Sequence, residues 1–204
     1  MDDIRNLKAL QLDALREVAN IGAGHAATAL SQMTGHTIMI SVPKLTITPL
    51  DEVPNQISDR EEPVAAVLMK MVGDLTGLTL LVFPQPTALK VAGLMMKRDD
   101  LVELTELPQS ALKEAGNILS AAYLNALSEF MGMILLPSPP SLAIDMSDAV
   151  LSSTYVEIAK GAEYVFCIES EFYLTELDQR LRGFFLLLPD AQSLTSILRA
   201  IRVA

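Results

Sequence analysis

One eight-residue pattern occurs twice in this 204-residue chain, and no other feature of the sequence restricts the fold as strongly. The segment Asp13–Asn20 reads DALREVAN, and Ser110–Asn117, which begins 97 residues later, reads SALKEAGN. In each copy a proline, Pro43 or Pro140, follows the asparagine by 23 residues. A recurrence with the same internal spacing predicts that the chain contains two structurally equivalent halves.

The two halves are expected to form a single domain over 1–204, with internal repeats over approximately 5–98 and 103–204. In each half the apolar residues first recur at the spacing of a helix, then alternate as in strands, and then return to helical spacing. Successive strands lack the crossover helices that a parallel sheet needs. The sequence therefore predicts a layered α/β (α+β) fold with antiparallel or mixed strands, formed by tandem pseudo-twofold duplication of a helix–strand–hairpin–helix unit.

The expected elements differ between the halves at one place. The first half is expected to contain a helix over 5–34, a strand over 37–49, a polar loop over 51–62, a hairpin of 64–72 and 78–83, and a helix over 84–97. The second half is expected to contain a helix over 105–131, a strand within 133–145, an inserted helix over 147–160, a hairpin of 164–175 and 182–188, and a helix over 190–201. The two long helices are rich in small residues at Gly22–Ala29 and Ser120–Ala126, which predicts that they cross closely.

Composition excludes several classes of function. The net charge of −10 argues against nucleic acid, because phosphate contacts need a clustered basic surface. No apolar run approaches the roughly 20 residues of a membrane-spanning helix, and the acidic N-terminus lacks the cationic region of a signal peptide. A single cysteine, Cys167, excludes a disulfide framework and is typical of a reducing cytosol. We therefore expect a cytoplasmic protein that binds neither nucleic acid nor membrane.

Most chemically active side chains are expected to have ordinary structural roles. The sequence has no neighbouring Cys and His, no H-E-x-x-H motif and no carboxylates at ligand spacing, so no metal site of its own is predicted. His25 and His36 are expected on the surface or at a helix end. Cys167 lies in an apolar strand and is expected to be buried. The segments Glu169–Glu171 and Glu61–Glu62 are expected to be solvated.

What remains is a glutamate and an asparagine in each copy, Glu17 with Asn20 and Glu114 with Asn117. Residues three apart on a helix share a face, with roughly 5–6 Å between their Cβ atoms. A carboxylate beside an amide is able to hold a water and a cation, or to contact a lysine of a partner. In phosphoryl transfer to water most of the catalysis is positioning and charge compensation. The alternative is a structural role, in which the pair forms a hydrogen bond to a strand near one of the two prolines.

The doubled pattern Asp/Ser-x3-Glu-x2-Asn-x22-Pro resembles the CheC family of chemotaxis phosphatases. The resemblance implies hydrolysis of the aspartyl phosphate of the response regulator CheY. It implies that Glu17 and Glu114 contact the regulator and that Asn20 and Asn117 orient the attacking water. The remaining motif positions, with a supporting role, are Asp13, Pro43, Ser110 and Pro140. Two motifs in one chain match the CheC type better than the CheX type, which resembles a shorter chain with one motif.

The resemblance also implies partners. It predicts binding to CheD, the receptor deamidase that enhances the phosphatase, and Mg²⁺ carried by the regulator rather than by this chain. The protein is expected to be monomeric when alone. The segment 147–160, which breaks the twofold, is a candidate surface for CheD; the alternative is that it covers the end of the sheet. The alternative to an enzyme is a non-catalytic adaptor that binds CheD, CheY or both.

Overall fold

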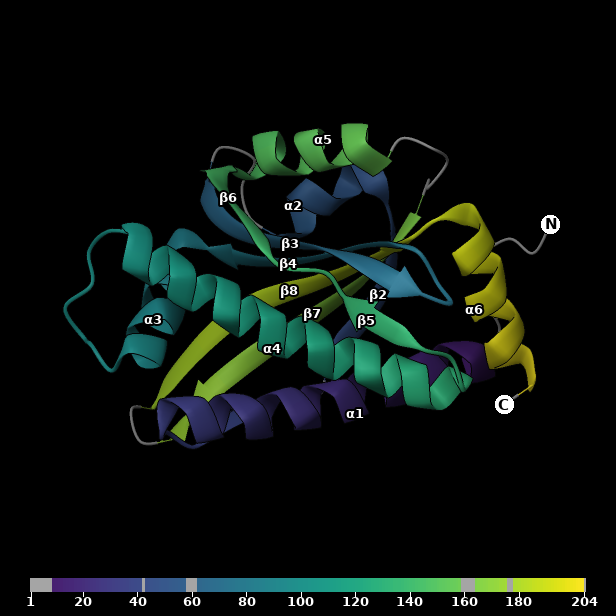
Figure 1. Ribbon diagram of the computed structural model, residues 1–204, viewed down its shortest axis with the longest axis horizontal. Coiled ribbons are helices and arrows are strands. Elements are labelled where there is room, and N and C mark those ends of the chain that lie inside the picture. The colour runs from purple at the N-terminus through teal and green to yellow at the C-terminus, as the bar shows by residue number, and fades with distance from the viewer. Residues whose placement is uncertain (1–8, 42, 58–61, 159–163, 176–177, 204) are drawn as a thin grey trace.

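The computed structural model describes residues 9–41, 43–57, 62–158, 164–175 and 178–203 (Figure 1). The first half contains α1 (Ala9–Thr34), β1 (Ile38–Ile40), β2 (Lys44–Pro49), the 3₁₀ helix η2 (Leu50–Glu52), α2 (Val53–Ile57), β3 (Pro63–Gly73), β4 (Gly77–Pro84) and α3 (Gln85–Met96). The second half contains α4 (Glu106–Met131), β5 (Leu135–Pro137), β6 (Ser141–Met146), α5 (Ser147–Ile158), β7 (Tyr164–Leu174), β8 (Gln179–Pro189) and α6 (Ala191–Val203).

The two long helices, α1 and α4, end in the same way. Each is followed by a glycine with positive φ, Gly35 at 76° and Gly132 at 64°. The Gly35 N–H donates to the carbonyl of Ser31 at 3.0 Å, which satisfies one of the last helical acceptors. Glycine adopts this left-handed conformation at no steric cost, so both ends are set by local sequence. The predicted C-terminal limit of each helix is confirmed to within a residue or two.

The strands of the described residues form one antiparallel sheet in the order β1-β7-β8-β4-β3-β5, with β2 also paired to β7 and β6 to β3. Hairpin β3–β4 comes from the first half and hairpin β7–β8 from the second. They meet at the centre of the sheet, where β4 pairs with β8 and Leu81 lies opposite Phe185. The prediction of antiparallel or mixed pairing is confirmed, and the two halves share a single sheet.

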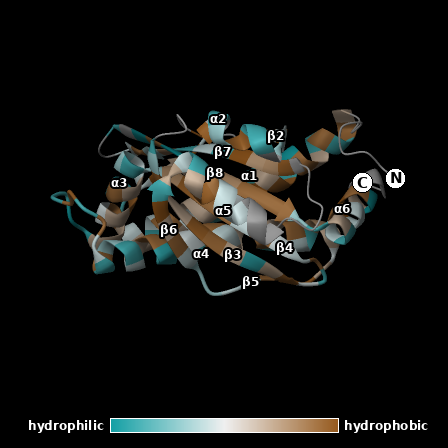
Figure 2. Ribbon diagram, turned by 90° about the horizontal axis from the view of Figure 1, so that it is seen from above, coloured by the Kyte–Doolittle hydropathy of each residue, from teal (hydrophilic) through white to brown (hydrophobic). Residues whose placement is uncertain are grey.

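Each face of the sheet has its own core. Side chains of a strand alternate between faces, so Val67 and Met69 pack with α1, α3 and α4, whereas Val64 and Ala66 pack on the other side with α2 and α5. Figure 1 shows α1 and α4 side by side over one face. Figure 2, seen from above, shows largely hydrophobic strands beneath α5. The structure thus has three layers, with the long helices forming one outer surface.

Two predictions about the segments that connect the short strands to the hairpins are wrong. Residues 51–62 are not a polar loop, because 50–57 form η2 and α2; residues 58–61 lie outside the described part. Val53 and Ile57, one helical turn apart, are fully buried against the core beneath α5. The helix α5 is therefore not an insertion, since α2 occupies the same place in the order of the first half. Residues 159 and 160 also lie outside the described part.

The single strand expected over 37–49 is divided into β1 and β2, which pair with opposite ends of β7. Pro43 lies at the division, and Pro140 lies at the matching division between β5 and β6. Proline has no N–H to donate and so interrupts the ladder. Beyond the prolines, β2 contacts α1 and β6 contacts α4. The motif prolines therefore shape the strand that runs alongside the helix of their own half.

Candidate functional site

The candidate site is built on the paired helices α1 and α4. A Cβ added to Gly22 would lie 2.6 Å from Cδ1 and 3.0 Å from Cα of Tyr123. The backbones of α1 and α4 therefore approach each other at a distance that only glycine permits at position 22. Ala26 and Ser120 are also fully buried along this contact. The predicted close approach through small residues is confirmed. It holds the two helices in a fixed relation on one side of the sheet.

The Glu/Asn pairs lie on the outer side of these helices. Val18 and Ala19 of α1 and Ala115 and Gly116 of α4 face the core. Glu17 and Glu114 are consequently exposed to solvent, and Asn20 and Asn117 are half-buried. Each pair is therefore presented on the surface of its own helix, as the spacing of Glu and Asn predicted.

Within the described part of the chain, none of the four side chains forms a hydrogen bond or an ion pair. The alternative role, a hydrogen bond that anchors a neighbouring strand, is not found there. The carboxylates and amides are instead available to groups from outside the chain. A carboxylate or amide with no hydrogen-bond partner among the described residues is suited to bind a ligand or to orient one.

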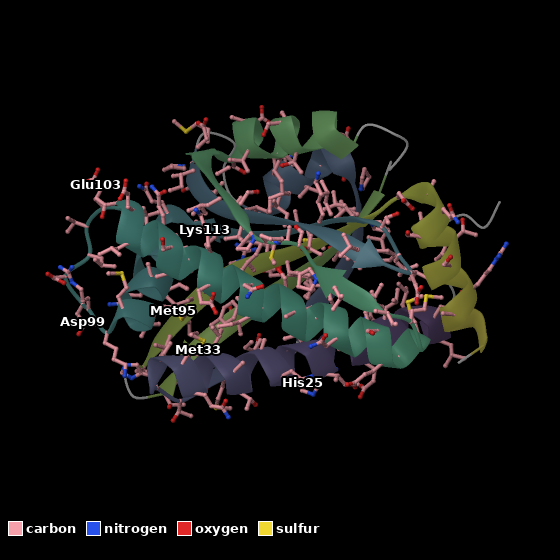
Figure 3. The ribbon with its side chains drawn as sticks, in the orientation of Figure 1. His25, Met33, Met95, Asp99, Glu103 and Lys113 are labelled. Atoms are coloured by element: carbon pink, nitrogen blue, oxygen red, sulfur yellow. The ribbon has the colours of Figure 1, made fainter. Side chains whose placement is uncertain are left out.

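The surroundings of the two pairs differ in charge. Beside the first pair, Arg16 donates to Asp13 at 2.9 Å in an exposed ion pair. The equivalent positions of the second copy are Ser110 and Lys113, and among the described residues Lys113 has no ion-pair partner. Lys113 is half-buried on α4, one turn before Asn117 (Figure 3). The second pair thus has a cation beside it that no carboxylate of the described residues neutralises.

Other reactive groups have structural positions. Burial raises the pKa of the Cys167 thiol to about 12, so at neutral pH it remains a protonated apolar side chain rather than a nucleophile. His25 points away from α1 into solvent (Figure 3), and His36 is half-buried just after the end of α1. No group of three or more His, Cys, Asp or Glu residues gathers at metal-binding distance within the described ranges.

The expectation that Glu169–Glu171 is solvated is confirmed for Glu171, which is exposed, and is wrong for Ser170 between the two glutamates. Glu169 accepts a hydrogen bond from Arg182 at 2.6 Å. Ser170 is buried, and its hydroxyl is hydrogen-bonded to the Tyr123 hydroxyl at 3.0 Å. Tyr123 also stacks on Phe185 with 4.6 Å between ring centroids. Sequence reasoning missed this anchor of α4 to the sheet, because its partners are far apart in the chain.

The fold and this site define a class of protein. A carboxylate–amide pair lies open to solvent on each of two packed helices, whereas sites for small molecules are concave and enclosed. Such surfaces are suited to a macromolecular partner. The chain belongs to the CheC-like family, whose model matches residues 10–47 and 108–144. The matched segments contain both Glu/Asn pairs and both motif prolines.

Individual relatives agree with this assignment. The chain is 33% identical over 205 residues to the CheY-P phosphatase CheC of Bacillus subtilis, with 98% of each chain covered. It is 30% identical over 146 residues to the flagellar motor switch phosphatase FliY of B. subtilis, covering 70% of this chain and 38% of that relative. The crystal structure of Thermotoga maritima FliY superimposes with a TM-score of 0.81 and 25% identity, over 97% of this chain and 98% of the other. No helix of the described residues combines the length and hydrophobicity needed to span a membrane.

Proposed function

We propose that this protein is a phosphatase that hydrolyses the aspartyl phosphate of the response regulator CheY. The observation that carries the proposal is an intact, outward-facing Glu/Asn pair in each of the two segments that match the CheC-like family. The B. subtilis relative that matches over 98% of both chains is named a CheY-P phosphatase. Phosphatase is also part of the name of the FliY relative.

The reaction needs little covalent chemistry from this chain. A water oxygen attacks the phosphorus and the bond from phosphorus to the aspartyl oxygen breaks. The aspartate leaves as a carboxylate, and the proton that the water loses passes to an oxygen of the released phosphate. The amide of Asn20 or Asn117 accepts a hydrogen bond from the water through its oxygen and holds it in line. The carboxylate of Glu17 or Glu114 contacts a cationic side chain of the regulator, which fixes the approach. Positioning of this kind supplies most of the catalysis in phosphoryl transfer.

The decay of purified CheY-P tests this function. We expect catalytic amounts of the protein to increase the first-order rate of decay, in proportion to its concentration and over many turnovers. The alternative is a non-catalytic adaptor. An unchanged decay rate, together with measurable binding of the protein to CheY-P, would favour the adaptor and reject the phosphatase.

We also propose that the chain has no metal or cofactor of its own and that Mg²⁺ is carried by the regulator. The described residues do not gather ligands for a metal. Elemental analysis of the purified protein is expected to find metal well below one equivalent. Dialysis against a chelator should leave the midpoint of thermal unfolding unchanged. A tightly held equivalent of metal, or a marked fall in that midpoint, would contradict the proposal.

CheD is the second proposed partner, with α5 as its docking surface. Ala149, Ser152 and Ser153 of α5 are exposed, and the helix lies outside α2 on its side of the sheet (Figure 1). The substitution Ser152→Arg is expected to weaken CheD binding at least tenfold and to leave the phosphatase rate unchanged. A matched change at exposed Thr195 on α6, Thr195→Arg, should affect neither. Equal CheD affinity for all three proteins would place the partner elsewhere.

A further inference from the structure

Two leucines at equivalent positions are almost equally exposed to solvent. Leu10 on α1 is 71% exposed and Leu107 on α4 is 70% exposed. They are 97 residues apart, the same separation that relates Glu17 to Glu114. A single exposed leucine is common in folded proteins. Leucines exposed to the same extent at equivalent positions of both copies need a separate explanation, because folding does not require that exposure.

Each leucine lies on the same helical face as the glutamate of its copy. Seven residues separate Leu107 from Glu114, which is close to two full turns and about 10 Å along the axis. Ala111 lies between them, and Ile118 continues the face one turn beyond the glutamate. We call this face, with Asn117, the docking stripe. In the first copy the stripe consists of Leu10, Ala14, Glu17, Asn20 and Ile21.

All five residues of the docking stripe are identical in the two copies, whereas the buried side of the same helices is not. On the buried side Val18 is replaced by Ala115 and Gly22 by Leu119. Other buried positions, such as Leu15 and Leu112, are identical, so the buried side is repeated only in part. Ala111 and Ile118 of the stripe are partly buried against the core. The leucine and the glutamate of each copy are exposed and have no such constraint from the fold, so their identity indicates one shared contact outside the chain. In the proposed function the Glu/Asn pair makes that contact, and the leucine lies on the same helical face as the glutamate.

We propose that Leu107 and Leu10 are docking residues for the acyl-phosphorylated response regulator. Resting on the proposed function, this inference assigns to the regulator an apolar surface about 15 Å from its phosphoryl group, because the leucine precedes the asparagine by ten residues along the helix. The leucine is buried there when the Glu/Asn pair engages the phosphoryl group. It adds binding energy without touching the reacting atoms, which are held by the pair. Leu107 is therefore a positioning residue and determines the affinity of the encounter.

The test isolates one site at a time. In a chain that carries Asn20→Ala, only the second pair is intact, and Leu107→Ser is expected to raise KM for CheY-P about tenfold with kcat unchanged. This pattern marks the loss of an interaction made equally in the ground state and the transition state. The variant Leu107→Met should restore most of the affinity. In a chain that carries Asn117→Ala, where only the first pair is intact, Leu10→Ser should raise KM in the same way.

Two matched controls distinguish docking at the stripe from a general effect of replacing an exposed apolar side chain. Val102 is 88% exposed in the loop before α4, and Leu136 is 55% exposed on β5, which follows α4 in the chain. Neither belongs to the docking stripe, so Val102→Ser and Leu136→Ser should leave KM unchanged. An unchanged KM in Leu107→Ser, or an equal rise in a control, would overturn the inference.

A binding measurement separates this inference from the proposed function. Titration with CheY that carries beryllofluoride in place of the phosphoryl group reads the affinity without turnover. If the Asn20→Ala chain binds this regulator but does not hydrolyse CheY-P, the phosphatase proposal fails at that site and the leucine is still tested. The chain retains Glu17 and Leu10, so the titration reports two sites, and a tenfold weaker Kd at one of them in Leu107→Ser would support docking. Two unchanged Kd values would reject it.

Discussion

The double variant Asn20→Ala/Asn117→Ala is expected to lose the acceleration of CheY-P hydrolysis, with a fall in rate of roughly 10²-fold or more. Alanine cannot hold the attacking water in line, and both sites are removed together. The free energy of unfolding should stay within about 1 kcal/mol of the parent, because neither amide has a hydrogen bond within the described residues. Phosphate release and thermal unfolding, measured on the same preparation, check both parts.

The single variants and a matched asparagine complete this experiment. Asn20→Ala and Asn117→Ala should each retain the activity of the other pair. Asn125 is an exposed asparagine on α4 outside the pair, and Asn125→Ala should behave as the parent. An unchanged rate in the folded double variant would reject the mechanism. A loss caused by Asn125→Ala would mean that the effect arises from general disturbance of α4.

Much of the fold could be predicted because its signals are local. Helical spacing of apolar residues located α1 and α4, and Gly35 and Gly132 ended them through their own conformational freedom. The hairpins followed from two apolar runs on either side of a short turn. The candidate site could be predicted for a different reason. Its spacing of Glu and Asn recurs, and helix geometry alone places such a pair on one face.

The remaining features depend on contacts between distant segments. Val53 and Ile57 stand among polar residues, and only packing beneath α5 makes that segment a helix. Ser170 lies between two glutamates and is buried because Tyr123 of α4 supplies a hydrogen bond. Single-chain patterns do not encode such partners. In the same way, the exposure of Leu107 could not be read from its sequence, where it resembles a core leucine of an amphipathic helix.

Replacement of Gly22 by leucine is expected to lower the free energy of unfolding by about 3 kcal/mol. A Cβ at this position already falls 2.6 Å from the ring of Tyr123 and 3.0 Å from its Cα, and the backbone of α4 cannot yield as a flexible side chain can. Tyr123 is itself held by a hydrogen bond to Ser170 and by stacking on Phe185. The two helices must therefore move apart, or the leucine side chain must adopt a strained conformation. Thermal unfolding should show a decrease in Tm of roughly 10 °C for a domain of this size.

The same substitution two residues later provides the control. Gly24 is exposed, and a Cβ there would meet no other atom within 4 Å. Leucine is a better helix former than glycine by up to about 1 kcal/mol, so Gly24→Leu should be neutral or slightly stabilising. Opposite effects from one substitution at neighbouring helical positions would isolate the contact with α4 as the cause. If both variants unfolded at the temperature of the parent, the close approach of α1 and α4 could not be what holds the pair of helices together.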